Sequence, residues 1–181
     1  MFLSDIDIKK SVESGDIIIE GFDEKRLQAA SYDILLGNKF LITDSYLTPI
    51  IDPVKKILPK TREIHIADGE EFVLHPGVSL LGFSWDYFGS NHYLVQLSGK
   101  SSLARIGLVV HNTAGLINPG HFLNIAFELS NLNNVPIILR PKMEIAQITF
   151  SKLSSPSSKT YDKVGRYHEN NWTGFIEKKV D

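Results

Sequence analysis

The stretch that decides the fold is residues 98–131, SGKSSLARIGLVVHNTAGLINPGHFLNIAFELSN. Within it, residues 123–130 alternate between large apolar side chains and small or polar ones, which is the period of a strand with one buried face. The apolar members are expected on one face and the polar members, including Glu128, on the other. Turns are expected at residues 113–115 and 118–120. The stretch therefore predicts strands joined by tight turns, with one carboxylate on a polar face.

Short strands separated by turn residues continue on both sides of this stretch. They are predicted at residues 17–20, 31–37, 40–42, 50–52, 64–66, 71–74, 78–84, 94–97, 108–110, 135–139 and 145–150. One helix is expected to begin after Ser4, an N-cap residue, and to end at Ser14 and Gly15. Many short strands with one helix are typical of a mainly β fold, either a sandwich, a jelly roll or a barrel. Residues 1–181 are predicted to form one domain, with a polar tail at 151–181 that orders when a ligand or neighbour holds it.

Composition limits the classes of function. The chain has 181 residues, 43% hydrophobic and 22% charged, and a net charge of -2, so no broad basic surface for nucleic acid is expected. It has no cysteine, which excludes disulfides and cysteine-ligated zinc or iron–sulfur sites. The six histidines show no ligand spacing, so no metal site is predicted. The first residues resemble neither a signal peptide nor a membrane span, and a cytoplasmic protein without a membrane partner is expected.

Three groups in the central stretch are candidates for chemistry, and each has an ordinary structural interpretation. Residues 99–102, Gly-Lys-Ser-Ser, offer a cation, two hydroxyls and backbone N–H groups to a phosphate, or they simply cap a short helix. Arg105 stands four residues after Ser101, so the two share a helical face. Its charge either pairs with a carboxylate or a phosphate, in which case Arg105 could orient Glu128, or it belongs to a solvated surface arginine. Glu128 lies in mid-strand, where glutamate is disfavoured, and is either a general base or an outward-facing polar residue.

Nine segments follow one another in an order that resembles a known family. They are LSDIDI (3–8), QAASYD (28–33), LG (36–37), FVLHPG (72–77), GKSSLARIG (99–107), HNTAG (111–115), FELSN (127–131), IAQ (145–147) and LSSP (153–156). Together they resemble the dCTP deaminase family, within the trimeric dUTPase superfamily. The resemblance spans most of the chain.

The resemblance implies a distorted β-barrel or jelly-roll subunit of dUTPase-like type, a homotrimer with active sites shared between subunits, and hydrolysis of dCTP to dUTP and ammonia. The implied catalytic residues are Glu128, Ser101, Arg105 and Ala114. The implied nucleotide-binding residues are Lys100, Ser101, Ser102, Leu103, Ala104, Arg105, Asn118, Ala126, Phe127, Glu128, Tyr161, Arg166 and Asn170. Mg²⁺ would arrive on the triphosphate rather than on protein ligands, zinc would be absent, and dTTP is a candidate regulator.

The sequence departs from the family pattern at the turn of residues 117–120. The family usually has aspartate where this chain has Asn118, and in related dUTPases that aspartate activates the water that attacks the triphosphate. Asparagine can bind a sugar hydroxyl but cannot act as a base at neutral pH. Three hypotheses therefore stay open: a dCTP deaminase, a dUTPase or bifunctional enzyme, and a nucleotide-binding relative without catalysis.

Overall fold

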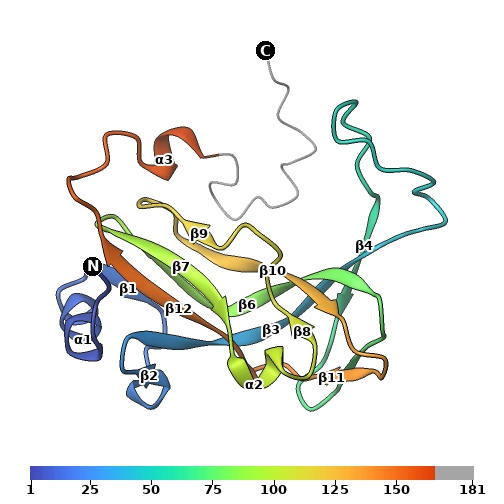
Figure 1. The fold of residues 1–181 in the computed structure, drawn as a ribbon, viewed down its shortest axis with the longest axis horizontal. Helices are drawn as coiled ribbons and strands as arrows, with labels where there is room; N and C mark the ends of the chain where they lie inside the picture. The colour runs from blue at the N-terminus through green and yellow to red at the C-terminus, as the bar shows by residue number, and fades with distance from the viewer. Residues whose placement is uncertain (166–181) are drawn as a thin grey trace.

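The computed structural model describes residues 1–165. These residues form a curled antiparallel sheet with short helices at its margins (Figure 1). The helices are α1 (Asp5–Glu13), the single 3₁₀ turn η1 (Glu24–Arg26), α2 (Ser101–Ala104) and α3 (Tyr161–Val164). The strands are β1 (Ile17–Ile19), β2 (Leu27–Gln28), β3 (Ser31–Thr43), β4 (Thr61–His65), β5 (Phe72–Leu74), β6 (Ser79–Ser90), β7 (Tyr93–Gly99), β8 (Leu108–Val109), β9 (Leu116–Ile117), β10 (Leu123–Asn131), β11 (Ile137–Leu139) and β12 (Glu144–Lys152).

Ten strands form the main sheet. Its central path runs β8-β10-β6-β3-β12-β7-β9, with β1 added to β6 and with β2 and β4 added to β3. The remaining two, β5 and β11, pair with each other. The sheet curls into a half-barrel that contains β7 and β10, the two strands at the ends of the central stretch. This confirms the predicted mainly β, distorted-barrel fold.

The long strand β3 produces much of the curl, and here the prediction was wrong. The sequence suggested a strand ending at Gly37 and a second one at residues 40–42, but β3 runs unbroken through Gly37. Its first half pairs with β12 and its second half with β6. A Cβ atom at Gly37 would lie 2.8 Å from the backbone oxygen of Phe83, so only glycine allows β6 to approach where β3 changes partner.

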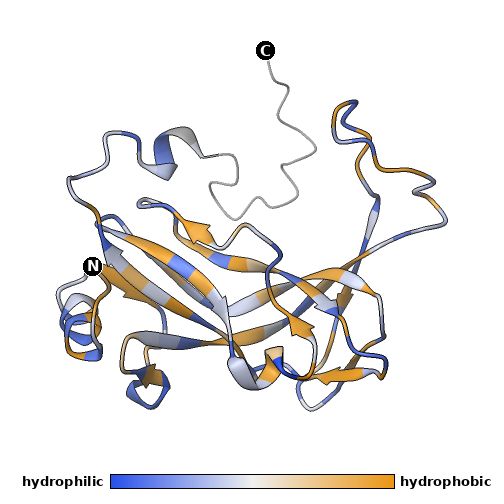
Figure 2. Cartoon of the chain, viewed as in Figure 1, coloured by the Kyte–Doolittle hydropathy of each residue, from blue (hydrophilic) through white to orange (hydrophobic). Residues whose placement is uncertain are grey.

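The alternation predicted for β10 is confirmed. Its residues are alternately buried and partly exposed along the whole strand, and Phe127 and Leu129 are completely buried. Figure 2 shows apolar residues along the sheet strands, and these form one continuous core with the inner side of α1. Each large apolar side chain buried there stabilises the fold by about 1.5–3 kcal/mol.

The predicted N-terminal helix is also confirmed. The Ser4 hydroxyl accepts a hydrogen bond from the Asp7 N–H at 3.4 Å, and Gly15 follows the helix with a left-handed φ of 81°. Within the part of the chain that the structure describes, no helix combines the length and the hydropathy that a membrane span needs.

Other strand boundaries differ from the predictions. The segment 50–52 contains only an isolated bridge between Asp52 and Ile57, and β6 extends to Ser90, well beyond the predicted residue 84. Strand β9 and helix α3 were not predicted at all. The local patterns were too short to reveal them, since two paired residues or a single helical turn carry no periodicity.

A buried ion pair between η1 and β6 was likewise not predicted. Nη1 of Arg26 lies 2.8 and 3.0 Å from the two carboxylate oxygens of Asp86, whose side chain is 2% exposed. Asp86 also accepts a hydrogen bond from the backbone N–H of Leu35 at 2.7 Å. The pair therefore joins β6 to β3 beside the bend at Gly37.

Candidate active site

The central stretch folds back on itself around the open side of the sheet. Strand β7 ends at Gly99 and is followed by α2. The chain then continues as β8, which pairs with the last two residues of β10. The loop 111–115 crosses to β9, which pairs with β7. The Gly-Lys-Ser-Ser segment therefore connects β7 to the strand that pairs with the end of β10, and the first predicted turn lies in the loop that leads to β9.

Glu128 is held by backbone groups of the same stretch. Its own N–H donates to the carbonyl of Val110 at 3.1 Å. Its Oε2 accepts a hydrogen bond from the N–H of Asn112 at 2.7 Å. The other carboxylate oxygen makes no hydrogen bond within residues 1–165, and the Glu128 side chain is partly exposed. A carboxylate held in this way suits the transfer of a proton to or from a bound molecule.

Ser101 and Arg105 lie at the two ends of α2, where the Arg105 N–H donates to the Ser101 carbonyl at 3.1 Å. Both residues are exposed, and their side chains form no hydrogen bond or ion pair within the described part of the chain. Arg105 was predicted as a group that could orient Glu128, but the hydrogen-bond donor to Glu128 in this structure is the N–H of Asn112. The role of Arg105 towards a bound nucleotide stays a prediction.

The other predicted residues of this region differ in how far their side chains are exposed. Ser102, Ala104 and Ala114 are exposed, whereas Leu103 packs its side chain against the core. Ala126 lies on the same face of β10 as Glu128. Phe127 is completely buried, so it can reach a ligand through its backbone and not through its ring.

Lys100 has two carboxylate partners. Its Nζ lies 2.6 Å from Asp33 on β3 and 2.7 Å from Glu144 on β12. Burial acts to lower the pKa of Lys100, but the hydrogen bonds to Asp33 and Glu144 outweigh that effect and raise this pKa above 10.5. The ammonium group is therefore firmly charged and already engaged with both side chains.

The turn that contains Asn118 contacts the beginning of the tail. Asn118 is exposed, and its carbonyl accepts from the His121 N–H at 3.1 Å. The ring of Tyr161 stacks on His121 with centroids 3.7 Å apart and an interplanar angle of 12°. The Tyr161 N–H also donates to the Pro119 carbonyl at 2.8 Å. Tyr161 thus lies on this turn, with His121 as a partner that sequence reasoning missed, while Arg166 and Asn170 lie outside the described residues.

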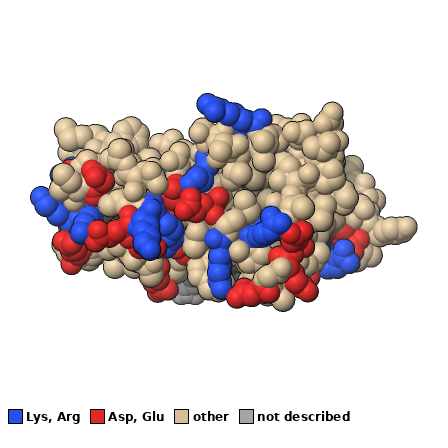
Figure 3. All heavy atoms as spheres, turned by 90° about the horizontal axis from the view of Figure 1, so that it is seen from below, with Lys and Arg blue, Asp and Glu red and all other residues tan. Residues whose placement is uncertain are grey.

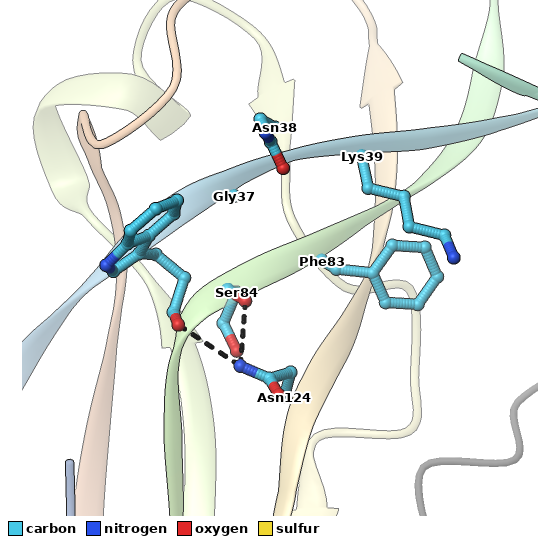
Figure 4. Close-up of a pocket in the computed structure, with 7 residues that line it drawn as sticks. Gly37, Asn38, Lys39, Phe83, Ser84 and Asn124 are labelled. Atoms are coloured by element: carbon cyan, nitrogen blue, oxygen red, sulfur yellow. Dashed lines mark hydrogen bonds between the residues drawn. The ribbon is translucent and has the colours of Figure 1, made fainter. Parts of the chain in front are cut away.

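A pocket of about 320 Å³ opens on the sheet between β3, β6 and β10, and it contains none of the predicted residues. Its lining includes Gly37, Phe83, Ser84 and Asn124, and Figure 4 shows the Asn124 amide donating to the carbonyls of Ser84 and Trp85 at 3.2 and 3.1 Å. Of the predicted catalytic residues, Ser101, Arg105 and Ala114 are exposed and Glu128 is partly buried.

Charged side chains of both signs are interspersed on the underside of the molecule, the side on which Figure 1 places α2 (Figure 3). Within residues 1–165, no group of three or more histidine, aspartate or glutamate side chains is arranged to hold a metal ion.

Comparison with known proteins agrees with the order of these segments. A family model described as dCTP deaminase-like matches residues 2–153. The chain belongs to this family. Among the relatives of this dCTP deaminase-like chain is a protein of Corynebacterium efficiens named "dCTP deaminase, dUMP-forming", 41% identical over 162 residues, 89% of this chain and 84% of the relative. A protein of Coprothermobacter proteolyticus with the same name is 39% identical over 168 residues, 92% of this chain and 90% of the relative.

A crystal structure of 2'-deoxycytidine 5'-triphosphate deaminase from Agrobacterium tumefaciens shares the fold of this dCTP deaminase-like chain, with a TM-score of 0.63 at 21% identity. The match covers 84% of this chain but 48% of that one, so this chain spans about half the length of the solved protein. The names of these two relatives give dUMP as the product that they form.

Proposed function

We propose that this chain hydrolyses dCTP at the cytosine amino group and that Glu128 is the general base. The observation that carries the proposal is the fixed carboxylate of Glu128, bound by the Asn112 N–H at 2.7 Å, in a chain 41% identical to a named dCTP deaminase. Glu128 and Ala126 share the partly exposed face of β10, and the small side chain of Ala126 would leave room for a flat pyrimidine ring.

The proposed chemistry needs no protein-bound metal. Water has a pKa near 15.7, so a base must take its proton as the oxygen attacks C4 of cytosine. Glu128 would accept that proton and pass it to N3. It would then take the second proton from the new hydroxyl group on C4 and pass it to the departing amine, so that dCTP and water become dUTP and ammonia. The Ser101 hydroxyl and the Ala114 carbonyl would hold the water and the amino group. Arg105 would balance the charge, and Mg²⁺ would enter as part of the triphosphate substrate.

We further propose that dUMP is the end product, formed by a slower second hydrolysis. The names of the relatives favour this reaction. We expect this second hydrolysis to be slow, because the amide of Asn118 cannot take a proton from water. Asn118 would keep the contact with the sugar hydroxyl.

The active assembly is proposed to be a homotrimer. Ser101, Arg105, Ala114 and Asn118 are all exposed in the single chain, so a bound nucleotide would be open to water without a neighbour. Residues from about 157 onward are proposed to close over the phosphates, starting from the contact of Tyr161 with His121. Control by dTTP would act at the same nucleotide site.

The test is to incubate the purified protein with dCTP and, separately, with dUTP, each with Mg²⁺, and to follow ammonia, dUTP, dUMP and pyrophosphate over time. Early dUTP and ammonia followed by later dUMP are expected. Pyrophosphate from dUTP without any release of ammonia from dCTP would identify a dUTPase. Binding of dCTP without turnover would identify a non-catalytic relative and would refute the proposal.

A further inference from the structure

The pocket between β3, β6 and β10 has an aromatic wall and a positively charged rim, and we call it the Trp85 pocket. Phe83 and Trp85 line it from β6, and Trp85 is 48% exposed. The ammonium nitrogen of Lys39 lies 5.9 Å from the centre of the Phe83 ring (Figure 4). That of Lys142 lies 4.6 Å from the centre of the Trp85 ring. These groups suit an aromatic side chain that is followed by an acidic one.

The Trp85 pocket is built into the sheet. Strands β3 and β10, which flank β6, both shift register beside it. The Ser84 hydroxyl accepts the Ile125 N–H at 2.8 Å and donates to the Asp86 carbonyl at 2.7 Å. The Asn124 amide donates to the carbonyls of Ser84 and Trp85. Hydrogen bonds and two irregularities of the sheet therefore fix the shape of the hollow.

The described part of the tail ends close to this pocket. Tyr161 is stacked on His121, and Asn124, which lines the Trp85 pocket, follows His121 by only three positions. An extended chain spans about 3.3 Å per residue, so the seven residues from 166 to 172 can cover about 23 Å. The pocket therefore lies within reach of the residues that follow Gly165 in the same chain.

The sequence of the tail contains an apolar group that matches the pocket. Residues 151–170 are mainly polar, whereas residues 171–177, NWTGFIE, bring together Trp172, Phe175 and Ile176 and end in Glu177. Tryptophan is a common anchor between protein segments, because its ring buries a large area in one pocket. The Glu177 carboxylate complements the two lysines of the rim, although each of them already has one acidic partner.

We propose that residues 171–177 dock in the Trp85 pocket of the same chain, with the Trp172 ring against Trp85, and that this contact holds the preceding tail residues over the nucleotide. The inference rests on the proposed function and on the family resemblance, which places Arg166 and Asn170 at the nucleotide. It adds an anchor that lies outside the nucleotide site itself.

The position of the pocket explains how docking would affect the substrate. Phe83 is the direct partner of Ala126 in the pairing of β6 with β10, so the Trp85 pocket adjoins the proposed site for the pyrimidine. The residues between Tyr161 and Trp172 would then be held at both ends beside the partly exposed face of β10. Closure of the tail over a bound nucleotide would cost less entropy, because both ends are already fixed.

Disulfide capture tests the docking directly, because the chain has no cysteine of its own. Asn38, which lines the pocket, and Thr173, next to the proposed anchor, are replaced together (Asn38→Cys, Thr173→Cys) and oxidised with diamide in the absence of nucleotide. We expect an internal disulfide in most chains, seen as a faster-migrating monomer on a non-reducing denaturing gel. Lys10→Cys with Thr173→Cys, at an exposed lysine of α1, is the matched control and should form little of it.

Kinetics test the consequence for the substrate. Trp172→Ala and Trp85→Ala should each raise KM for dCTP about five- to tenfold, because the closed tail is less populated, and the double variant should be no worse than either alone. The value of kcat should change less than about threefold, because the anchor does not touch the reacting atoms. Tyr46→Ala, at an aromatic residue that is 99% exposed in the loop between β3 and β4, is the matched control and should behave as the wild type.

Three results would overturn the proposal: capture no greater than in the control, an unchanged KM in Trp172→Ala, or effects on KM that add in the double variant. A disulfide-linked dimer in place of the internal bond would also overturn it, because the pocket would then hold the tail of another copy. If Trp85→Ala does not fold, Trp172→Ala and the capture decide.

The capture keeps this inference separate from the proposed function. Internal capture in a protein that never deaminates dCTP would refute the deaminase proposal and leave the docking established. Deamination of dCTP without capture would refute the docking alone.

Discussion

Replacing Glu128 by glutamine tests the centre of the proposed mechanism. Glutamine keeps the shape of the side chain and one oxygen that can accept the hydrogen bond from the Asn112 N–H, now 2.7 Å from Oε2. It loses the negative charge and with it the ability to take a proton from water. Glu128→Gln should therefore fold normally and fail in catalysis.

The size of each effect follows from this single contact. A hydrogen bond to a charged acceptor contributes about 1.5–3 kcal/mol and a neutral one about 0.5–1.5 kcal/mol, so the exchange costs roughly 1 kcal/mol of stability. For a domain of this size, that lowers the thermal midpoint by about 2–4 °C. Loss of a general base lowers kcat by about 10²-fold or more, equivalent to ~2.7 kcal/mol in the activation free energy. Binding of dCTP should change by less than about tenfold.

The assay combines ammonia release under saturating dCTP with calorimetric binding and a thermal scan. Glu20→Gln, at an exposed glutamate directly after β1, is the matched control for loss of one surface carboxylate and should retain full turnover. A Glu128→Gln variant that kept more than half of wild-type kcat would refute the assignment of the base. Loss of binding together with activity would mean that Glu128 contacts the ground state, and not only the transition state.

Three further perturbations test neighbouring features. Asn118→Asp supplies a carboxylate at the sugar turn and should raise the rate of pyrophosphate release from dUTP, as measured by phosphate detection after pyrophosphatase; wild-type protein that already makes dUMP as fast as dUTP would contradict this reasoning. His121→Ala removes the ring under Tyr161 and should raise KM for dCTP several-fold at unchanged stability of the sheet, whereas His121→Phe should preserve the stacking and KM. Asp86→Asn leaves Arg26 buried without its carboxylate and should cost about 3–5 kcal/mol in chemical denaturation, and a loss below 1 kcal/mol would show that the pair is dispensable.

Local patterns in the sequence were sufficient for the elements that bury one face or begin with a cap. The alternation in residues 123–130 matches β10, and Ser4 with Gly15 brackets α1, because these signals depend only on neighbours within one or two turns. The same alternation places Glu128 on the polar face of β10.

Contacts between distant segments were beyond this kind of reasoning. Gly37 was interpreted as the end of a strand because glycine weakens strands, but its function is to let β6 approach β3 within van der Waals distance. The prediction for Lys100 considered the phosphate-like composition of residues 99–102 alone. It could not include Asp33 and Glu144, which lie 67 and 44 positions away and meet Lys100 only when the sheet curls.

The orientation of Glu128 shows most clearly where the limit lies. The sequence suggested Arg105 as the group that orients Glu128, because an arginine can be recognised from the sequence alone as a partner for a carboxylate. In the folded chain the donor is the backbone N–H of Asn112, a group that every residue except proline carries and that no composition reveals. The N–H is positioned by the loop between β8 and β9, whose other end is fixed where the Leu97 N–H donates to the Gly115 carbonyl at 2.7 Å. Substitutions that loosen this loop should therefore lower kcat without touching a charged residue.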